Sequence, residues 1–197
     1  MTFWDFCAPL YDLAEKVNEY AYNKMLKTVS DIVPQGASVL EAAAGTGSIS
    51  VAVSQKARWV LCTDISDNML KIARRKAANF SNITVDKRSI YELGEPDGAF
   101  DIVIAGQVLH LIDEPQKAAA ELRRVAKSEV ILPMSFTKNL RGTAKFGVSV
   151  YRLFGFSPKI EFTAEDYAAF LPAIGFENCE FIQLSGKIPM AVAIWRK

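Results

Sequence analysis

Residues 38–53, SVLEAAAGTGSISVAV, contain the residue types and spacing that most strongly indicate chemistry. A run of small and apolar residues reaches Glu41, a bend with Gly45 and Gly47 follows, and apolar residues resume at Ile49. A buried strand that breaks at small residues and restarts as a helix brings backbone N–H groups close to a ligand. The stretch therefore predicts a cofactor-binding loop.

The order of the acid and the glycines restricts which ligand this loop can hold. A dinucleotide fingerprint, G-x-G-x-x-G/A, starts directly after its strand. Here Glu41 closes the strand, and the register Gly45-x-Gly47-x-x-Ser50 is only a partial match. A carboxylate at this point repels a pyrophosphate and suits an ammonium group. These features disfavour an NAD(P)-binding oxidoreductase and favour a ligand such as S-adenosylmethionine, which carries an amino-acid end and no phosphate.

Four motifs in sequence order resemble those of class I S-adenosylmethionine-dependent methyltransferases, in the type 11 and type 25 groups that act on small molecules, lipids or quinones. They are VLEAAAGTG at 39–47, VLCTDISDNMLKIA at 60–73, FDIVIAGQVLHL at 100–111 and AAAELRRVAK at 118–127. The resemblance implies an α/β fold with a Rossmann-like, seven-stranded, mostly parallel sheet, a C-terminal antiparallel hairpin and helices on both faces. It also implies S-adenosyl-L-methionine as the cofactor and S-adenosyl-L-homocysteine as its product.

The apolar pattern and the turn residues place the elements that would position such a site. We expect strands at 38–42, 58–63, 83–87, 100–105, 129–133, 176–184 and 190–195, and helices at 46–56, 68–79, 113–126 and 163–173. Asp64 follows the second strand at the ligand edge of a parallel sheet, where its carboxylate can accept bonds from two ribose hydroxyls. Ser66 is expected to cap the next helix, and Asp113 the one after the fourth strand.

The resemblance assigns further cofactor contacts residue by residue. Ile65 and Met69 would pack on the adenine, while Ser89 stands where relatives have an acid for the adenine amino group. Ala43 stands where many relatives have glycine. The expected cofactor-binding residues are Tyr11, Glu41, Ala43, Gly45, Gly47, Asp64, Ile65, Met69, Ser89, Ile90 and Ala105.

No grouping of acids with histidine identifies a catalytic residue. His110 is the only histidine, a residue type that can titrate near neutral pH and relay a proton. Its apolar neighbours, including Leu109 and Leu111, favour a structural role instead. Tyr11 and Gln107 are the other candidates for substrate contact or catalysis, and no metal site is expected.

The chain is expected to form a single domain in four parts. Residues 1–34 would make an N-terminal helical cap, 35–135 the cofactor-binding core, 136–160 a substrate lid, and 161–197 the last helix and hairpin. Residues 136–160 mix aromatic with basic side chains and contain no acid. This mixture suits an amphipathic, anionic substrate or peripheral membrane contact; a lid with solvated lysines is the equal alternative.

Composition limits the functional class. The 197 residues are 50% hydrophobic with a net charge of +1, so no charge excess indicates nucleic acid. Three scattered cysteines, the lack of a basic-apolar leader and the lack of an apolar run of about 20 residues predict a cytoplasmic protein. We expect a small-molecule or amphipathic substrate and a monomer or homodimer. A noncatalytic protein that only binds S-adenosylmethionine is the remaining alternative.

Overall fold

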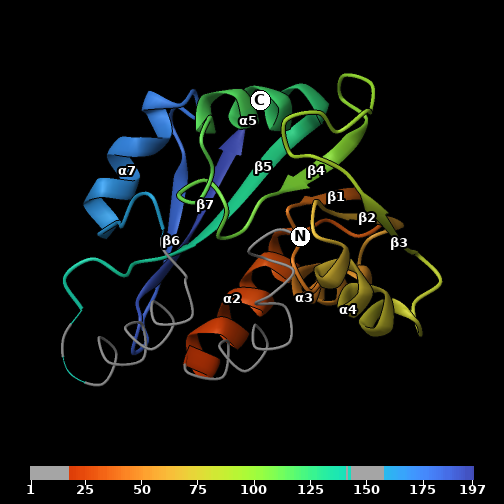
Figure 1. The fold of residues 1–197 in the computed structure, drawn as a ribbon, viewed down its shortest axis with the longest axis horizontal. Helices are drawn as coiled ribbons and strands as arrows, with labels where there is room; N and C mark the ends of the chain where they lie inside the picture. Colours follow the sequence, from red (N-terminus) through yellow and green to blue (C-terminus); the bar gives the residue numbers. More distant parts are fainter. Residues whose placement is uncertain (1–17, 141, 143–157) are drawn as a thin grey trace.

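A seven-stranded sheet organises the chain, for which a computed structural model describes residues 18–140, 142 and 158–197 (Figure 1). Its strand order is β3-β2-β1-β4-β5-β7-β6. Strands β1 to β5 are mutually parallel, and β7 runs antiparallel to both β5 and β6. This confirms the predicted sheet and its C-terminal hairpin. The strands are β1 (Ser38–Ala42), β2 (Trp59–Asp64), β3 (Ile83–Lys87), β4 (Phe100–Ile104), β5 (Ala126–Ser135), β6 (Glu180–Leu184) and β7 (Met190–Arg196).

Helices cover both faces of the sheet (Figure 1). On one face lie α2 (Glu19–Ile32) and α3 (Ser48–Ser54), with α4 (Asp67–Ala77) packed beside α3. On the other lie α5 (Pro115–Val125) and α7 (Ala164–Ala173). The alternation of side chains along each strand produces two cores, because Val39 points to the α2 and α3 side whereas its neighbour Leu40 points to the α5 and α7 side.

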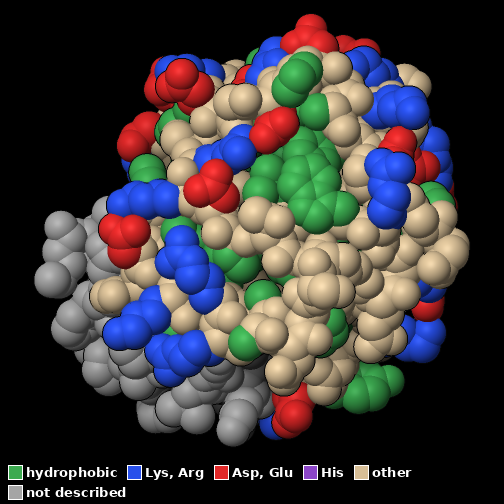
Figure 2. Space-filling model, turned by 90° about the vertical axis from the view of Figure 1, so that its right-hand side faces the viewer, with side chains coloured by type: hydrophobic (Ala, Val, Ile, Leu, Met, Phe, Trp, Pro, Cys, Tyr) green, Lys and Arg blue, Asp and Glu red, His purple; other side chains and the backbone are tan. Residues whose placement is uncertain are grey.

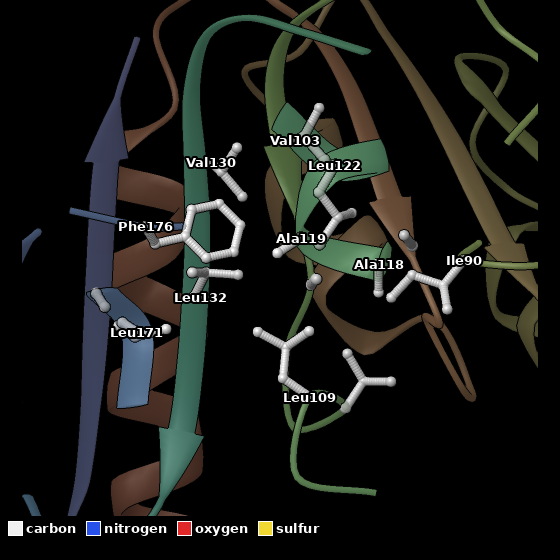
Figure 3. Packing of buried hydrophobic residues seen from close by; sticks show 14 of the residues in the cluster. Ile90, Val103, Leu109, Ala118, Ala119, Leu122, Val130, Leu132, Leu171 and Phe176 are labelled. Atoms are coloured by element: carbon white, nitrogen blue, oxygen red, sulfur yellow. The ribbon is translucent and has the colours of Figure 1, made fainter. Parts of the chain in front are cut away.

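The core under α5 fixes the central strands. Figure 3 shows Ala118, Ala119 and Leu122 of α5 facing Val103 of β4 and Val130 of β5. All five side chains are fully buried. Two of the three helix residues are alanines, which allow the helix to approach the sheet closely. This packing holds β4 and β5 in register and so fixes the edge where their carboxyl ends emerge.

Side-chain caps set the starts of two of the described helices. Ser66 caps α4 by accepting a hydrogen bond from the Met69 amide, as the sequence predicts, and Thr163 forms a capping box with Asp166 at α7. The predicted cap at Asp113 is wrong. The N-cap of α5 is Glu114 without a side-chain bond, and Asp113 instead pairs with Lys159.

Parts of the predicted organisation fall outside the described residues. These include Tyr11, residues 1–17 of the N-terminal cap and the greater part of the 136–160 segment. On the face drawn in Figure 2, Lys and Arg side chains lie among Asp and Glu side chains, with hydrophobic side chains gathered near the middle.

Within the described chain, no helix is both long and apolar enough to cross a membrane.

Candidate functional site

A cavity of about 280 Å³ opens at the carboxyl edge of the parallel strands. Its walls come from the ends of β1, β2, β3 and β4 and the segments that follow them, and none of its lining residues belongs to β5, β6 or β7. This is the edge where open α/β sheets bind ligands. The lining residues are Ala43, Gly45, Asp64, Ile65, Met69, Arg88, Ser89, Ile90, Tyr91, Gly106, Gln107, Val108, Leu111, Ile112 and Asp113.

The bend after β1 forms one wall and has an unusual backbone. Ala43, Gly45 and Gly47 have φ of 53°, 56° and 76°, which lie in the left-handed region. The bend is closed by a hydrogen bond from the Gly47 amide to the Ala44 carbonyl at 2.9 Å and tied to β2 by one from the Ala44 amide to the Thr63 carbonyl at 2.8 Å. Alanine in this conformation costs about 1 kcal/mol, so tertiary contacts hold Ala43 in a strained conformation at the cavity.

Asp64 closes β2 and is held in place by the backbone around it. Its Oδ2 accepts a hydrogen bond from the Gly45 amide and its Oδ1 one from the Ser66 amide, each at 2.8 Å. The residue is 7% exposed and lines the cavity. A carboxylate has about four acceptor positions on its two oxygens. Asp64 is therefore a carboxylate acceptor that the surrounding backbone orients at the edge of the cavity.

Glu41 is 2% exposed and is not among the cavity-lining residues. Its Oε2 accepts a hydrogen bond from the Ser50 amide at 2.7 Å and another from the Ser50 hydroxyl. These bonds join β1 to the first turn of α3, so Glu41 supports the bend from behind. The contact of Glu41 with an ammonium group stays a prediction.

The wall after β4 is also strained and also tied down. Gln107 has a φ of 56°, and its side chain exchanges two hydrogen bonds with Ser135 of β5: Nε2 to Oγ at 2.9 Å, and the Ser135 amide to Oε1 at 3.0 Å. A Cβ on Gly106 would come 3.0 Å from Ile49 Cδ1, so a larger residue here would have to displace the end of the Ile49 side chain. The side-chain amide of Gln107 is directed to β5.

The wall after β3 combines apolar surface with a neutralised cation. Arg88 donates to Asp86 at 2.9 Å and to Glu95 at 2.6 Å, and the hydrogen bond from Arg88 lowers the pKa of Asp86. Ser89 Oγ accepts a hydrogen bond from the Tyr91 amide at 3.3 Å. Apolar contact comes from Ile90 and, across the cavity entrance, from Ile65, which is 52% exposed. This wall suits an uncharged ring.

His110 does not line the cavity. Burial lowers its pKa to about 4, and within the described residues its Nδ1 has no hydrogen-bond partner. Its ring lies 6.4 Å from that of Phe162, and its carbonyl accepts from the amides of Lys159 and Ile160. At neutral pH the imidazole is uncharged and packed between the β4 loop and the 158–162 segment.

Comparison with known proteins agrees with the predicted resemblance. The family model described as a methyltransferase domain matches residues 40–133. This match, the sheet order and the cavity at the carboxyl edge of the sheet are all consistent with the predicted similarity to class I S-adenosylmethionine-dependent methyltransferases.

Proteins similar to this chain include enzymes named for quinone substrates. A demethylmenaquinone methyltransferase of Renibacterium salmoninarum is 32% identical over 128 residues, covering 63% of this chain and 52% of that protein. The chain thus spans about half the length of that relative, and 38% of a protein of the same name from Clavibacter sepedonicus. The ubiquinone/menaquinone biosynthesis C-methyltransferase UbiE of Psychromonas ingrahamii is 26% identical, covering 92% of this chain and 84% of that protein.

Solved structures of methyltransferases share the fold of this chain. A Thermotoga maritima S-adenosylmethionine-dependent methyltransferase, described as a possible histamine N-methyltransferase, superposes with a TM-score of 0.74 at 19% identity, covering 98% of this chain and 99% of that one. Magnesium protoporphyrin IX methyltransferase of Synechocystis with bound S-adenosylhomocysteine gives a TM-score of 0.68 at 21% identity, covering 90% and 84%.

The structure brings together part of the predicted site. Eight of the candidate residues line the cavity: Ala43, Gly45, Asp64, Ile65, Met69, Ser89, Ile90 and Gln107. Four do not, namely Glu41, Gly47, Ala105 and His110, while Tyr11 lies outside the described residues. Sequence reasoning missed the wall at 111–113, because Leu111 and Ile112 have the pattern of core residues and Asp113 that of a helix cap.

Proposed function

We propose that the protein transfers a methyl group from S-adenosylmethionine to a small aromatic acceptor of the quinone type. The observation that carries this proposal is the position of Asp64, between an apolar wall after β3 and the small-residue bend after β1, in a cavity of a methyltransferase domain. The names of the relatives support the class of acceptor.

The lining residues fit the chemical parts of the proposed cofactor. Asp64 is the carboxylate that would accept from the ribose hydroxyls. Ile65, Met69 and Ile90 offer apolar contact for an uncharged base, and they lie beside Asp64 on the β3 side of the cavity. On the other side, the small residues Gly45 and Gly106 leave room for a polar amino-acid end. A ribose at Asp64 thus divides an apolar end of the cavity from a polar one.

The chain's contribution to methyl transfer is orientation and exclusion of water. When bound, S-adenosylmethionine supplies an electrophilic methyl group on a sulfonium centre. Val108, Leu111 and Ile112 form an apolar wall that removes water from the ligand and holds an aromatic acceptor by contact. His110 is neutral and does not line the cavity, so it does not act as the general base of this mechanism. Asp113 lines the cavity but is paired with Lys159.

We also propose that the protein works in the cytoplasm, a reducing compartment. Cys62 and Cys179, the two cysteines in the described residues, are both free thiols. Burial is the main factor that raises the pKa of Cys62 to about 12 and that of Cys179 to about 11, which keeps both protonated and unreactive. The membrane contact predicted for residues 136–160 stays a prediction.

The direct test is a binding and turnover assay on the full chain. Calorimetry with S-adenosylhomocysteine should give a one-to-one complex, and methyl-labelled S-adenosylmethionine should label a demethylated quinone. NADH, added as a control, should not bind. Failure to bind either sulfur nucleoside would contradict the proposed function. Binding without any labelled product from cell extracts would favour a noncatalytic protein.

A further inference from the structure

The bend after β1 is held by charged side chains from several directions. Behind it, Glu41 bonds to Ser50, and Asp64 bonds to the Gly45 amide. On another side is α4, whose Lys76 reaches from its last turn to the bend. The two carboxylates belong to the sheet, whereas the ammonium belongs to a helix that itself lines the cavity through Met69.

Lys76 makes two specific contacts with this bend. Its Nζ donates a hydrogen bond to Thr46 Oγ1 at 2.8 Å and another to Ser48 Oγ at 3.0 Å. Thr46 is buried, and both contacts are part-buried. Hydrogen bonds from a charged donor are stronger than those between neutral groups. The ammonium therefore fixes the two residues that flank Gly47, at the point where the bend becomes α3.

The stability of α3 does not explain why the Lys76 ammonium lies at this position. The start of a helix carries positive partial charge, so a cation beside Ser48, the first residue of α3, is electrostatically unfavourable for that helix. What the contact does secure is the distance between α4 and the bend. α4 also approaches at Gly47, where a Cβ would lie 3.2 Å from Ala73 Cβ. The helix and the bend are thus fitted to each other.

From these contacts we propose that Lys76 is a positioning residue for the methyl donor, a role that rests on the proposed function. It holds the bend at residues 43–47, in which Ala43, Gly45 and Gly47 are left-handed, ready for the ligand. Because Met69 lies two turns earlier on the same helix, Lys76 also sets the spacing between the two walls that contact the ligand. Without it, each binding event must first order the bend, and affinity falls.

The test compares two lysines on one helix. Lys76→Met removes the contact, and Lys71→Met removes the same charge from an exposed position of α4. By calorimetry with S-adenosylhomocysteine, Lys76→Met should bind about tenfold more weakly, equivalent to about 1.4 kcal/mol, and Lys71→Met should stay within about twofold of the unmodified protein. Lys76→Arg, which keeps a charged donor, should recover most of the affinity.

A second variant separates positioning from stability. Ser48→Ala removes one acceptor but places a better helix former in α3. It should leave the melting temperature unchanged or higher while weakening the ligand about threefold. Hydrogen exchange at the amides of residues 44–47 should be faster in Lys76→Met than in Lys71→Met.

The possible outcomes are distinct. Equal affinities for Lys76→Met and Lys71→Met would overturn the role of Lys76, and so would a lower melting temperature in Lys76→Met with unchanged affinity. If the unmodified protein does not bind S-adenosylhomocysteine, the proposed function is overturned and this role with it.

Discussion

At the scale of single residues, strained backbone conformations lie at the candidate site. Ala43 and Gln107 are both non-glycine residues with left-handed φ, and both line the cavity. Such conformations cost free energy and persist only where surrounding contacts enforce them. Here the contacts are those of Asp64 with the bend and of Ser135 with Gln107. The cavity walls are therefore rigid backbone segments held by polar side chains.

Asp64 is the residue on which ligand affinity should depend most. Asp64→Ala should weaken S-adenosylmethionine binding at least about tenfold, roughly 1.4 kcal/mol or more, because hydrogen bonds to a charged acceptor are lost. Calorimetry measures this, with circular dichroism as the check on folding. Asp64→Asn, which keeps one acceptor oxygen, should lose less. A folded Asp64→Ala protein with unchanged affinity would contradict the assignment of Asp64 to the ribose.

Two glycines of similar φ allow conformational strain to be separated from steric clash. At Gly36 (φ 79°) an added Cβ would meet no heavy atom within 4 Å, whereas at Gly47 (φ 76°) it would lie 3.2 Å from Ala73 Cβ. Gly36→Ala should lower the free energy of unfolding by about 1 kcal/mol, the cost of a left-handed alanine. Gly47→Ala should lower it by clearly more. Urea unfolding measures both, and equal losses would show that α4 moves aside freely.

At the scale of elements, the sequence predicted strands well and contacts between distant segments poorly. The bounds of β1 and β3 agree with prediction because buried apolar runs end there in turn residues. β5 is longer than predicted at both ends, because Ala126 pairs with Phe100 of β4 and the pairing with β7 continues to Ser135. The prediction for Asp113 was wrong for a related reason: its partner, Lys159, is 46 residues away, and no local pattern indicates such a pair.

Two helix caps of the same kind should differ in their effect on the site. Ser66→Ala and Thr163→Ala each remove an N-cap hydrogen bond and should each cost about 1 kcal/mol of stability. Of the two, Ser66 bonds to the amide of a cavity-lining residue, Met69. We expect Ser66→Ala to weaken S-adenosylhomocysteine about threefold and Thr163→Ala to leave affinity unchanged. A matching loss of affinity in both variants would mean that it follows from stability alone.

At the scale of the whole molecule, the fold class and the ligand edge were predictable, and the complete cavity was not. Four ordered motifs indicated the sheet, and the confirmed strand order places Asp64 at its carboxyl edge. The role of Glu41 was not predictable, because whether a strand-end carboxylate points into a cavity or toward α3 depends on packing. Its partner, Ser50, is brought to it by the fold.

The buried histidine should make global stability depend on pH. Burial lowers the pKa of folded His110 to about 4, below the usual value of 6.5. The unfolded chain therefore binds a proton that the folded chain does not, so stability should fall as pH drops from about 6.5 toward 4. Urea unfolding at pH 7 and pH 5 should show the loss, and His110→Gln should reduce it. The same loss in His110→Gln would assign it to other groups.

The carboxyl groups with a lowered pKa change their contribution to stability below this pH interval. Hydrogen bonds from Arg88 to Asp86 and from Arg124 to Glu121 lower the pKa of each carboxyl group. Groups of this kind contribute stability that is present above their unfolded pKa, about 4, and lost as pH falls below it. A comparison between pH 7 and pH 5 therefore reports mainly on His110.

The sheet order separates the strands that form the cavity from those that complete the framework. Every cavity-lining residue lies at the end of a strand from β1 to β4 or after it, while β5, β7 and β6 complete the other side of the sheet. Substitutions in the terminal hairpin of β6 and β7 can thus raise or lower the melting temperature without altering the cavity. The pocket walls, in turn, can be exchanged for new acceptors while the hairpin keeps the framework folded. The bond between Gln107 and Ser135 crosses this boundary, and there the two kinds of change would meet.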